Sequence, residues 1–222
     1  MKLSKRLMAI ARMVQKHSNH GELADIGSDH GYLPVWLVLN DVISSAIACE
    51  IADGPIQASK KTIQLSHTED KISVKKGDGL QPIIGSQLDM ITICGMGGNL
   101  ICQILDRDLS KLAVSTLVLA PNVNEGMVRE WLMQHGWQIV DETAVEDMHH
   151  YYEIIVAKPG CMALNAKEIY MGPVLLKEKP DIIFKKWKWQ IGILENILKT
   201  LNESNEKHKM IHLQYQWLKE EL

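Results

Sequence analysis

Short apolar runs alternate with helix-like repeats through the first 160 residues. The runs are continuous and rich in β-branched residues, and they occupy positions 23–26, 45–50, 72–75, 90–94 and 116–119. Between them, apolar residues recur with helical spacing at positions 33–39, 55–66, 99–105 and 123–135. Continuous apolar runs are typical of strands that a parallel sheet buries on both faces. The pattern therefore predicts a doubly wound, Rossmann-like α/β domain.

Two further runs, at positions 137–143 and 151–157, are separated only by residues 144–150. A parallel neighbour needs a crossover of about a dozen residues or more, so this spacing predicts an antiparallel hairpin that gives the sheet an antiparallel edge. Ahead of the first strand, residues 1–20 predict an amphipathic helix with one apolar stripe, formed by Leu3, Leu7, Ile10 and Val14.

The composition changes near Pro159-Gly160, and no strand is predicted from Cys161 onward. Apolar residues there repeat at alternating spacings of four and three, as in a coiled coil, at Trp187, Ile191, Leu194, Leu198 and Leu201. Turn-prone residues 202–205 interrupt the repeat, and a second seam follows through Met210, Leu213 and Trp217. We expect a helical coiled-coil hairpin at 161–222 beside the α/β domain at 1–160; one long helix is the alternative.

The composition is that of a globular protein: 46% of the 222 residues are hydrophobic, and the formal net charge is −3. This balance excludes wholesale disorder and a uniformly basic nucleic-acid binder. The charge is unevenly divided, because residues 1–160 carry 14 basic and 19 acidic side chains, whereas residues 161–222 carry 10 and 8. The N-terminal helix is basic, with no acidic residue before Glu22.

The four cysteines, Cys49, Cys94, Cys102 and Cys161, lie far apart. Such spacing predicts free thiols in a reducing compartment, and hence a cytoplasmic protein. No apolar run reaches the ~18 residues that a membrane span needs. The histidine pairs His149-His150 and His208/His212 lack neighbouring cysteines or a second ligand pair, so we expect no metal.

The segment after the first strand has the composition of a ligand-binding turn. Gly27 and Gly31 allow a tight turn that leads into a helix N-terminus. A dinucleotide-binding turn needs glycine where this chain has Asp29, and a carboxylate beside a pyrophosphate is unfavourable. A cationic ligand tolerates Asp25 and Asp29 far better, and S-adenosylmethionine, a sulfonium with a charged amino group, fits this electrostatic pattern.

The next three strands also end in acidic or glycine-rich turns. Glu50, about 20 residues beyond the glycine turn, is spaced to accept hydrogen bonds from ribose hydroxyls. Asp78, between Gly77 and Gly79, could accept one from an adenine amino group, and Gly95-Met96 begins a stretch of bare backbone. Carboxyl ends of parallel strands share one sheet edge, where open α/β sheets bind ligands.

These motifs resemble the bacterial tRNA adenine-22 N1-methyltransferases over residues 1 to about 160. The matching segments are Asp25-Ile-Gly-Ser-Asp-His-Gly-Tyr-Leu-Pro34, Gly77-Asp-Gly-Leu80, Gly95-Met-Gly-Gly98, Pro121-Asn122, Arg129-Glu-Trp-Leu132 and Tyr152-Glu153-Ile154-Ile155. The resemblance implies a class I methyltransferase that uses S-adenosylmethionine to methylate N1 of an adenine in the tRNA D-arm region. It also implies the donor-site residues, by position: Asp25, Gly27 and His30 in the turn, Glu50 for the ribose, Asp78 for the adenine, and Gly95 with Met96 below the methyl group.

One position departs from the family pattern, since Ala120 stands where the family usually has glutamine. Asn122 is then the remaining candidate on the side of the target base. Tyr32 could stack on the donor or on a flipped base, with a buried packing role as the alternative. Asp29 could stabilise the cationic product ring, or only cap the helix that follows it.

Adenine N1 carries an in-plane lone pair and needs no deprotonation, so the expected mechanism is direct in-line attack after the base is exposed. We expect a monomer that contacts tRNA phosphates through basic residues at both ends of the chain, namely Lys5, Arg6, Arg12, Lys16, Lys185, Lys186 and Lys188. The alternatives are a methyltransferase for another RNA site, a protein or a small molecule, and a non-catalytic RNA-binding scaffold.

Overall fold

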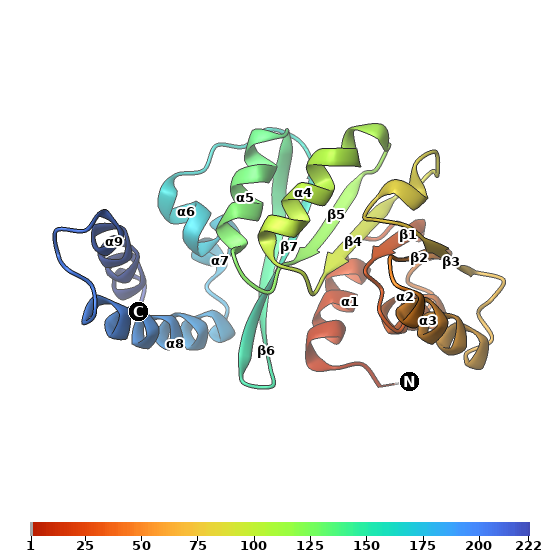
Figure 1. The fold of residues 1–222 in the computed structure, drawn as a ribbon, viewed down its shortest axis with the longest axis horizontal. Coiled ribbons are helices and arrows are strands. Elements are labelled where there is room, and N and C mark those ends of the chain that lie inside the picture. The colour runs from red at the N-terminus through yellow and green to blue at the C-terminus, as the bar shows by residue number, and fades with distance from the viewer. Residues whose placement is uncertain (1) are drawn as a thin grey trace. The chain divides into compact units, whose positions relative to one another are not determined.

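A computed structural model describes residues 2–222 of the chain (Figure 1). The chain divides into two compact units, Met1–Met162 and Ala163–Leu222. This division lies two residues beyond the boundary expected from the composition.

The first unit is built on one seven-stranded sheet with the order β3-β2-β1-β4-β5-β7-β6. Strands β1 to β5 are parallel, which confirms the doubly wound arrangement. The strands are β1 Glu22–Ile26, β2 Ser45–Glu50, β3 Ile72–Lys76, β4 Met90–Cys94, β5 Thr116–Ala120, β6 Trp137–Asp147 and β7 His150–Pro159. The order reverses between β1 and β4, so the carboxyl ends of these strands form the switch point of the sheet.

The expected hairpin is present, but the strand that runs opposite to the parallel strands is not the one at the edge of the sheet. Strand β7 runs antiparallel to both β5 and β6, and β6 occupies the edge. Both strands are longer than the apolar runs indicated, since polar residues continue the ladder from Ala144 opposite Glu153 to Asp147 opposite His150. Backbone pairing therefore extends the hairpin beyond its buried part.

Five helices accompany this sheet: α1 Lys5–His17, α2 Tyr32–Leu39, α3 Asp53–Leu65, α4 Gly98–Asp108 and α5 Glu125–Gln134. Helices α1, α2 and α3 pack one against the next, whereas α4 and α5 form a separate pair (Figure 1). The core joins apolar residues of α1 and α2 to those of the central strands, among them Ile10, Val14, Leu23, Leu37 and Val118.

Helix α1 is fixed at both ends to the edge strand β6. Ser4 caps its first turn, and the backbone N–H of Arg6 donates to Asp147 Oδ2 at 3.0 Å. At the other end, Lys16 Nζ and His17 Nε2 lie 2.6 and 2.7 Å from Asp141 Oδ2. These contacts hold the first turn of α1 beside the carboxyl ends of β4 and β5.

The second unit contains four helices: α6 Ala166–Met171, α7 Pro173–Glu178, α8 Asp181–Leu198 and α9 Glu206–Glu220. Helices α8 and α9 are separate and pack together, so the predicted hairpin is confirmed and the alternative of one long helix is wrong. Asn205, in the predicted turn, caps α9 by accepting from the backbone N–H of Lys207.

The seam predicted for α8 is buried at Trp187, Ile191 and Leu194, but the seam predicted for α9 is wrong at two of its three positions, since only Trp217 is partly buried. Met210 and Leu213 are exposed, whereas Ile211 and Leu218 are buried. Both sets have helical spacing, and only the position of the neighbouring helices decides which set faces inward. The coiled-coil character of the pair remains a prediction.

Within residues 2–222, no helix combines the length and the apolarity that crossing a membrane requires. The same residues contain no group of three or more His, Cys, Asp or Glu side chains arranged as metal ligands.

Candidate active site

The turn after β1 depends on glycine. Gly27 has φ +72° and Gly31 has φ +68°, values in the left-handed region that other residues adopt only at a cost. The N–H of Gly27 donates to the carbonyl of Cys49 at 3.0 Å, which joins the turn to the end of β2. Gly31 is the N-terminal cap of α2, so the turn leads directly into that helix.

Asp29 contributes to the turn mainly through its backbone. Its N–H donates to a carboxylate oxygen of Glu50, and its carbonyl accepts from Ser59 Oγ at 2.8 Å. The Asp29 side chain is exposed, and its Oδ1 lies 3.7 Å from Nε2 of His30. Helix α2 has Gly31 as its cap and no side-chain capping bond, so the alternative that Asp29 caps this helix is wrong.

Glu50 ends β2 as a buried carboxylate. Only Oε1 is bonded within the described part of the chain, to the N–H of Asp29, and Oε2 has no such partner there. The main-chain carbonyl of Glu50 accepts from Gly77 N–H at 2.9 Å, which fastens the turn after β3 beside it. A fixed carboxylate with one open oxygen is suited to accept from hydroxyl groups of a ligand.

Asp25 lies within β1 and is buried. Its two oxygens accept from Thr92 Oγ1 at 2.6 Å and from Ser28 Oγ at 2.7 Å. Burial raises the pKa of the Asp25 carboxyl above its ordinary 3.8; the two hydrogen bonds oppose this shift, and the charge of Glu50 adds to it. A cation bound nearby would favour the ionised form.

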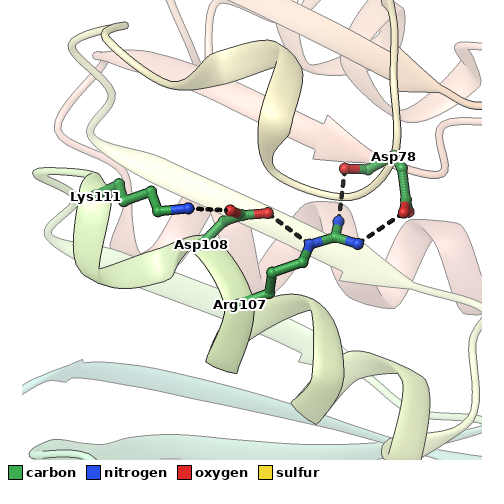
Figure 2. A network of polar contacts seen from close by, with 4 residues as sticks. All are labelled: Asp78, Arg107, Asp108 and Lys111. Carbon is green, nitrogen blue, oxygen red and sulfur yellow. Dashed lines mark hydrogen bonds and ion pairs between the residues drawn. The ribbon is translucent and has the colours of Figure 1, made fainter.

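Asp78, between β3 and the loop that follows, is held by a residue that the sequence did not single out. Nη1 of Arg107 lies 2.7 Å from Asp78 Oδ2, and Nη2 donates to the Asp78 carbonyl at 2.8 Å (Figure 2). Arg107 comes from the last turn of α4, 29 residues further along the chain. No sequence signal indicated this contact, because helix packing alone brings the two residues together.

The ends of β4 and β5 meet at Asn122. Its Nδ2 donates to the Gly95 carbonyl at 2.7 Å, and its backbone N–H donates to the Met96 carbonyl at 2.8 Å. Its Oδ1 accepts from Arg6 Nη1 at 3.0 Å, and the Arg6 guanidinium lies 4.8 Å from the ring centre of Tyr152. Arg6, expected as a phosphate contact, therefore faces this site.

Tyr32 begins α2 and is 41% exposed, so the alternative of a buried packing residue is wrong. Its ring is stacked on that of His30, with centroids 5.2 Å apart. Between this stack and α1 lies a cavity of about 90 Å³, lined by Arg6, Leu7, Asp25, Gly27, Ser28, Asp29, His30, Tyr32, Leu33 and Cys94. Ligand pockets usually measure roughly 300–1,000 Å³, so this cavity alone is smaller than a typical ligand site.

All four cysteines are free thiols. Burial raises the pKa of Cys49 to about 12, and it raises the pKa of Cys94, which lines the cavity, further still. Only a thiolate is an effective nucleophile. The neutral thiols at this edge therefore do not suit covalent catalysis.

The expected phosphate contacts differ in their surroundings. Lys5 and Arg12 are exposed and line a groove of about 520 Å³ between α1 and β6, whereas Lys16 is paired with Asp141. Lys185 and Lys188 of α8 are exposed. Lys186 is only 3% exposed, because it lies three residues after buried Ile183 on the inward face of the helix. This burial removes Lys186 from the candidate RNA-binding residues.

Comparison with known proteins identifies the family of this chain. Residues 23–221 match the model of the tRNA (adenine(22)-N(1))-methyltransferase family. A protein of Bacillus subtilis (strain 168) named tRNA (adenine(22)-N(1))-methyltransferase is 39% identical over 96% of this chain and 93% of its own.

Solved structures agree over nearly the whole length. A Streptococcus pneumoniae protein in complex with S-adenosyl-L-methionine is 39% identical, with TM-score 0.91 over all of both chains. M. capricolum TrmK, in complex with S-adenosyl-homocysteine, is 28% identical, with TM-score 0.86 over 99% of this chain and 97% of its own. The chain belongs to the tRNA (adenine(22)-N(1))-methyltransferase family.

Proposed function

We propose that this protein transfers the methyl group of S-adenosylmethionine to N1 of adenine 22 in tRNA. The observation that carries the proposal is the row of carboxylates at the switch point of a family-matched sheet. Asp25 and Glu50 lie near the carboxyl ends of β1 and β2, Asp78 follows β3, and a cationic donor complements all three. A nucleotide with a pyrophosphate would be repelled by the same groups.

Each part of the donor has a suitable partner at this edge. We assign the ribose hydroxyls to Glu50, supported by its open Oε2, and the adenine amino group to Asp78. Residues of the turn between Asp25 and His30 line the cavity that suits the methionine portion. The floor below the methyl group is assigned to Gly95 and Met96, with Gly79 beside the adenine. When bound, the donor supplies an electrophilic methyl group on a sulfonium.

The protein's own task is then to orient the target base and to exclude water. The N1 lone pair attacks the methyl carbon directly, and no residue need remove a proton. Asn122 is the candidate for holding the base, since its amide is oriented by Gly95 and Arg6. Tyr32 offers an exposed ring for stacking, and the Asp29 carboxylate can stabilise the positive charge that develops on the ring.

The tRNA partner is supported by the distribution of unpaired basic side chains. Lys5 and Arg12 lie along the groove beside β6, on the helix whose first turn also carries Arg6 to the site. Lys185 and Lys188 offer further positive charge in the second unit. Because N1 lies on the pairing edge of adenine, a paired target must leave its helix before it reacts.

The test is incubation of the protein with labelled S-adenosylmethionine and unmodified tRNA transcripts, followed by nucleoside mass spectrometry and primer extension. We expect 1-methyladenosine and a primer-extension stop at position 22. A transcript with guanosine at position 22 is the matched control and should gain no label. Label at another nucleotide would favour another RNA site, and donor binding without transfer would favour a scaffold.

We extend the proposal to a monomer that acts in the cytoplasm. The free thiols suit a reducing compartment. Light scattering during size-exclusion chromatography measures the mass in solution, with 25.1 kDa expected.

A further inference from the structure

We propose that Arg107 positions Asp78 for recognition of the 6-amino group of the donor's adenine, and that it thereby helps to set the selectivity for the donor. This inference rests on the proposed function, since it assigns a role within the same donor site. It concerns a residue on α4, outside the strand-end motifs that carry the family resemblance.

The contact fixes both the side chain and the main chain of Asp78. Nη1 of Arg107 lies 2.7 Å from Oδ2, and Nη2 donates to the carbonyl oxygen at 2.8 Å. The guanidinium is planar, so two bonds from one group define an orientation as well as a distance. Asp78 Oδ1 has no hydrogen-bond partner among residues 2–222, and it is left as an oriented acceptor.

Arg107 is itself held from the opposite side. Its Nε donates to Asp108 Oδ2 at 2.8 Å, and Lys111 Nζ lies 2.8 Å from Asp108 Oδ1 (Figure 2). The Asp108 carboxylate is buried, so the group that holds Arg107 from this side is shielded from solvent. Successive polar contacts from Lys111 through Asp108 and Arg107 to Asp78 thus connect the turn after β3 to the end of α4.

The neighbouring glycine agrees with this arrangement. A Cβ atom on Gly79 would lie 2.8 Å from Nη2 of Arg107, and Gly79 has φ +59°. A side chain at this position would therefore displace the arginine as well as strain the turn. The Gly-Asp-Gly sequence is compatible with a guanidinium passing directly behind the aspartate.

Stability alone does not explain the contact between Arg107 and Asp78. Their side chains are 40% and 51% exposed, and ion pairs with such exposure contribute little to folding. An aspartate that is already oriented, in contrast, loses less rotational freedom when a ligand binds. The expected effect is therefore on binding of the adenine.

The experiment compares Arg107→Gln and Arg107→Lys with the unaltered protein by calorimetry. The ligands are S-adenosylmethionine and an analogue whose adenine lacks the 6-amino group. We expect Arg107→Gln to weaken binding of S-adenosylmethionine about three- to tenfold. It should barely change binding of the analogue, so that discrimination between the two donors falls. Arg107→Lys, which can keep one of the two bonds, should be intermediate.

Lys61→Gln is the matched control, because it removes one exposed positive charge on α3 that takes no part in this network. It should leave both affinities unchanged, and kcat at saturating donor and the KM for tRNA should be unchanged in all three variants. Equal losses for the two donors, or no loss, would overturn the proposal. So would a large fall in the melting temperature of Arg107→Gln, which would make the contact structural. Failure of the unaltered protein to bind S-adenosylmethionine would instead refute the proposed function.

Discussion

In two carboxylates at the strand ends, those of Glu50 and Asp78, one oxygen is bonded within the protein and the other is open to a ligand. In Glu50 one oxygen accepts from a backbone N–H, and in Asp78 one oxygen pairs with Arg107. The second oxygen of each has no protein partner among the described residues. Polar groups that are oriented before a ligand arrives need little rearrangement when it binds, which favours both affinity and discrimination.

We expect Asp25 to make donor binding sensitive to pH. Burial raises its pKa above the ordinary 3.8, so the carboxylate takes up a proton at a higher pH than an exposed aspartate would. The ionised form attracts the cationic donor, and we expect the affinity to fall as the pH drops through this raised pKa. Calorimetry with S-adenosylmethionine from pH 8 downward measures the effect.

Asp25→Asn should bind the donor more weakly at pH 8 and show a flatter pH profile. Glu22→Gln, at the other end of β1, is the control and should keep the original profile. The same raised pKa predicts that folding stability decreases as the pH rises from the ordinary to the raised value, because only the unfolded chain ionises freely there. A pH-independent affinity in the unaltered protein would contradict this role of Asp25.

Sequence reasoning identified residues next to the strand ends far better than residues that reach the site from elsewhere. Asp25, Glu50 and Asp78 could be grouped because parallel strands end at one edge. Arg6 and Arg107 could not be assigned to it. Arg6 contacts Asn122 across 116 positions of the chain, and Arg107 contacts Asp78 across 29, so both contacts depend on helix packing.

At the scale of elements, a buried ion cluster joins α5 to the β6–β7 hairpin. Nε of Arg129 lies 2.7 Å from Glu142 Oε1, and its Nη2 pairs with Glu153. All three side chains are buried. Burial alone would lower the pKa of Arg129, but the two carboxylates outweigh it and raise the pKa.

Arg129→Met should destabilise the protein by about 3–5 kcal/mol, because two buried carboxylates lose their shared counter-ion. Urea denaturation followed by circular dichroism measures the loss. Replacing Arg129, Glu142 and Glu153 together with apolar residues should recover much of it, since no unpaired charge then remains. A loss below about 1 kcal/mol in the single variant would show that the cluster is not what holds α5 in place.

The helices and strands could be predicted where buried apolar residues follow a regular pattern along the chain. Strand β2 and strand β4 begin and end where their apolar runs do, at 45–50 and 90–94. The hairpin strands were underestimated because polar residues can pair their backbones in a ladder without burying side chains. The seam of α9 was wrong because Met210 and Ile211 are adjacent and equally apolar, and only packing distinguishes them.

At the scale of the molecule, the small negative net charge is the sum of an acidic region and a basic region with different proposed ligands. Acidic groups gather where a cationic donor is proposed, and exposed basic groups lie on α1 and α8. Nucleic-acid affinity depends on local phosphate neutralisation and counter-ion release, so the net charge is a poor guide to it.

Charge reversal at Lys5 and Arg12 together should weaken tRNA binding and reduce its salt dependence by about two units of slope or somewhat less. Donor affinity should be unchanged. Lys60→Glu with Lys61→Glu, an exposed pair on α3, is the control with the same change in net charge. Filter binding across a series of salt concentrations measures both quantities, and equal effects from the two double variants would refute a local contact on α1.

The docking of α1 has a consequence for how the enzyme is made. This helix is synthesised before the sheet, yet Arg6 contacts Asn122 and Asp147, and the latter lies 141 positions later. During translation, α1 therefore cannot make these contacts until the strands that carry its partners have emerged, and contacts of such long range form late. A growing chain can assemble the glycine turn and Glu50 early, but it completes the side facing the target base only when the hairpin has left the ribosome.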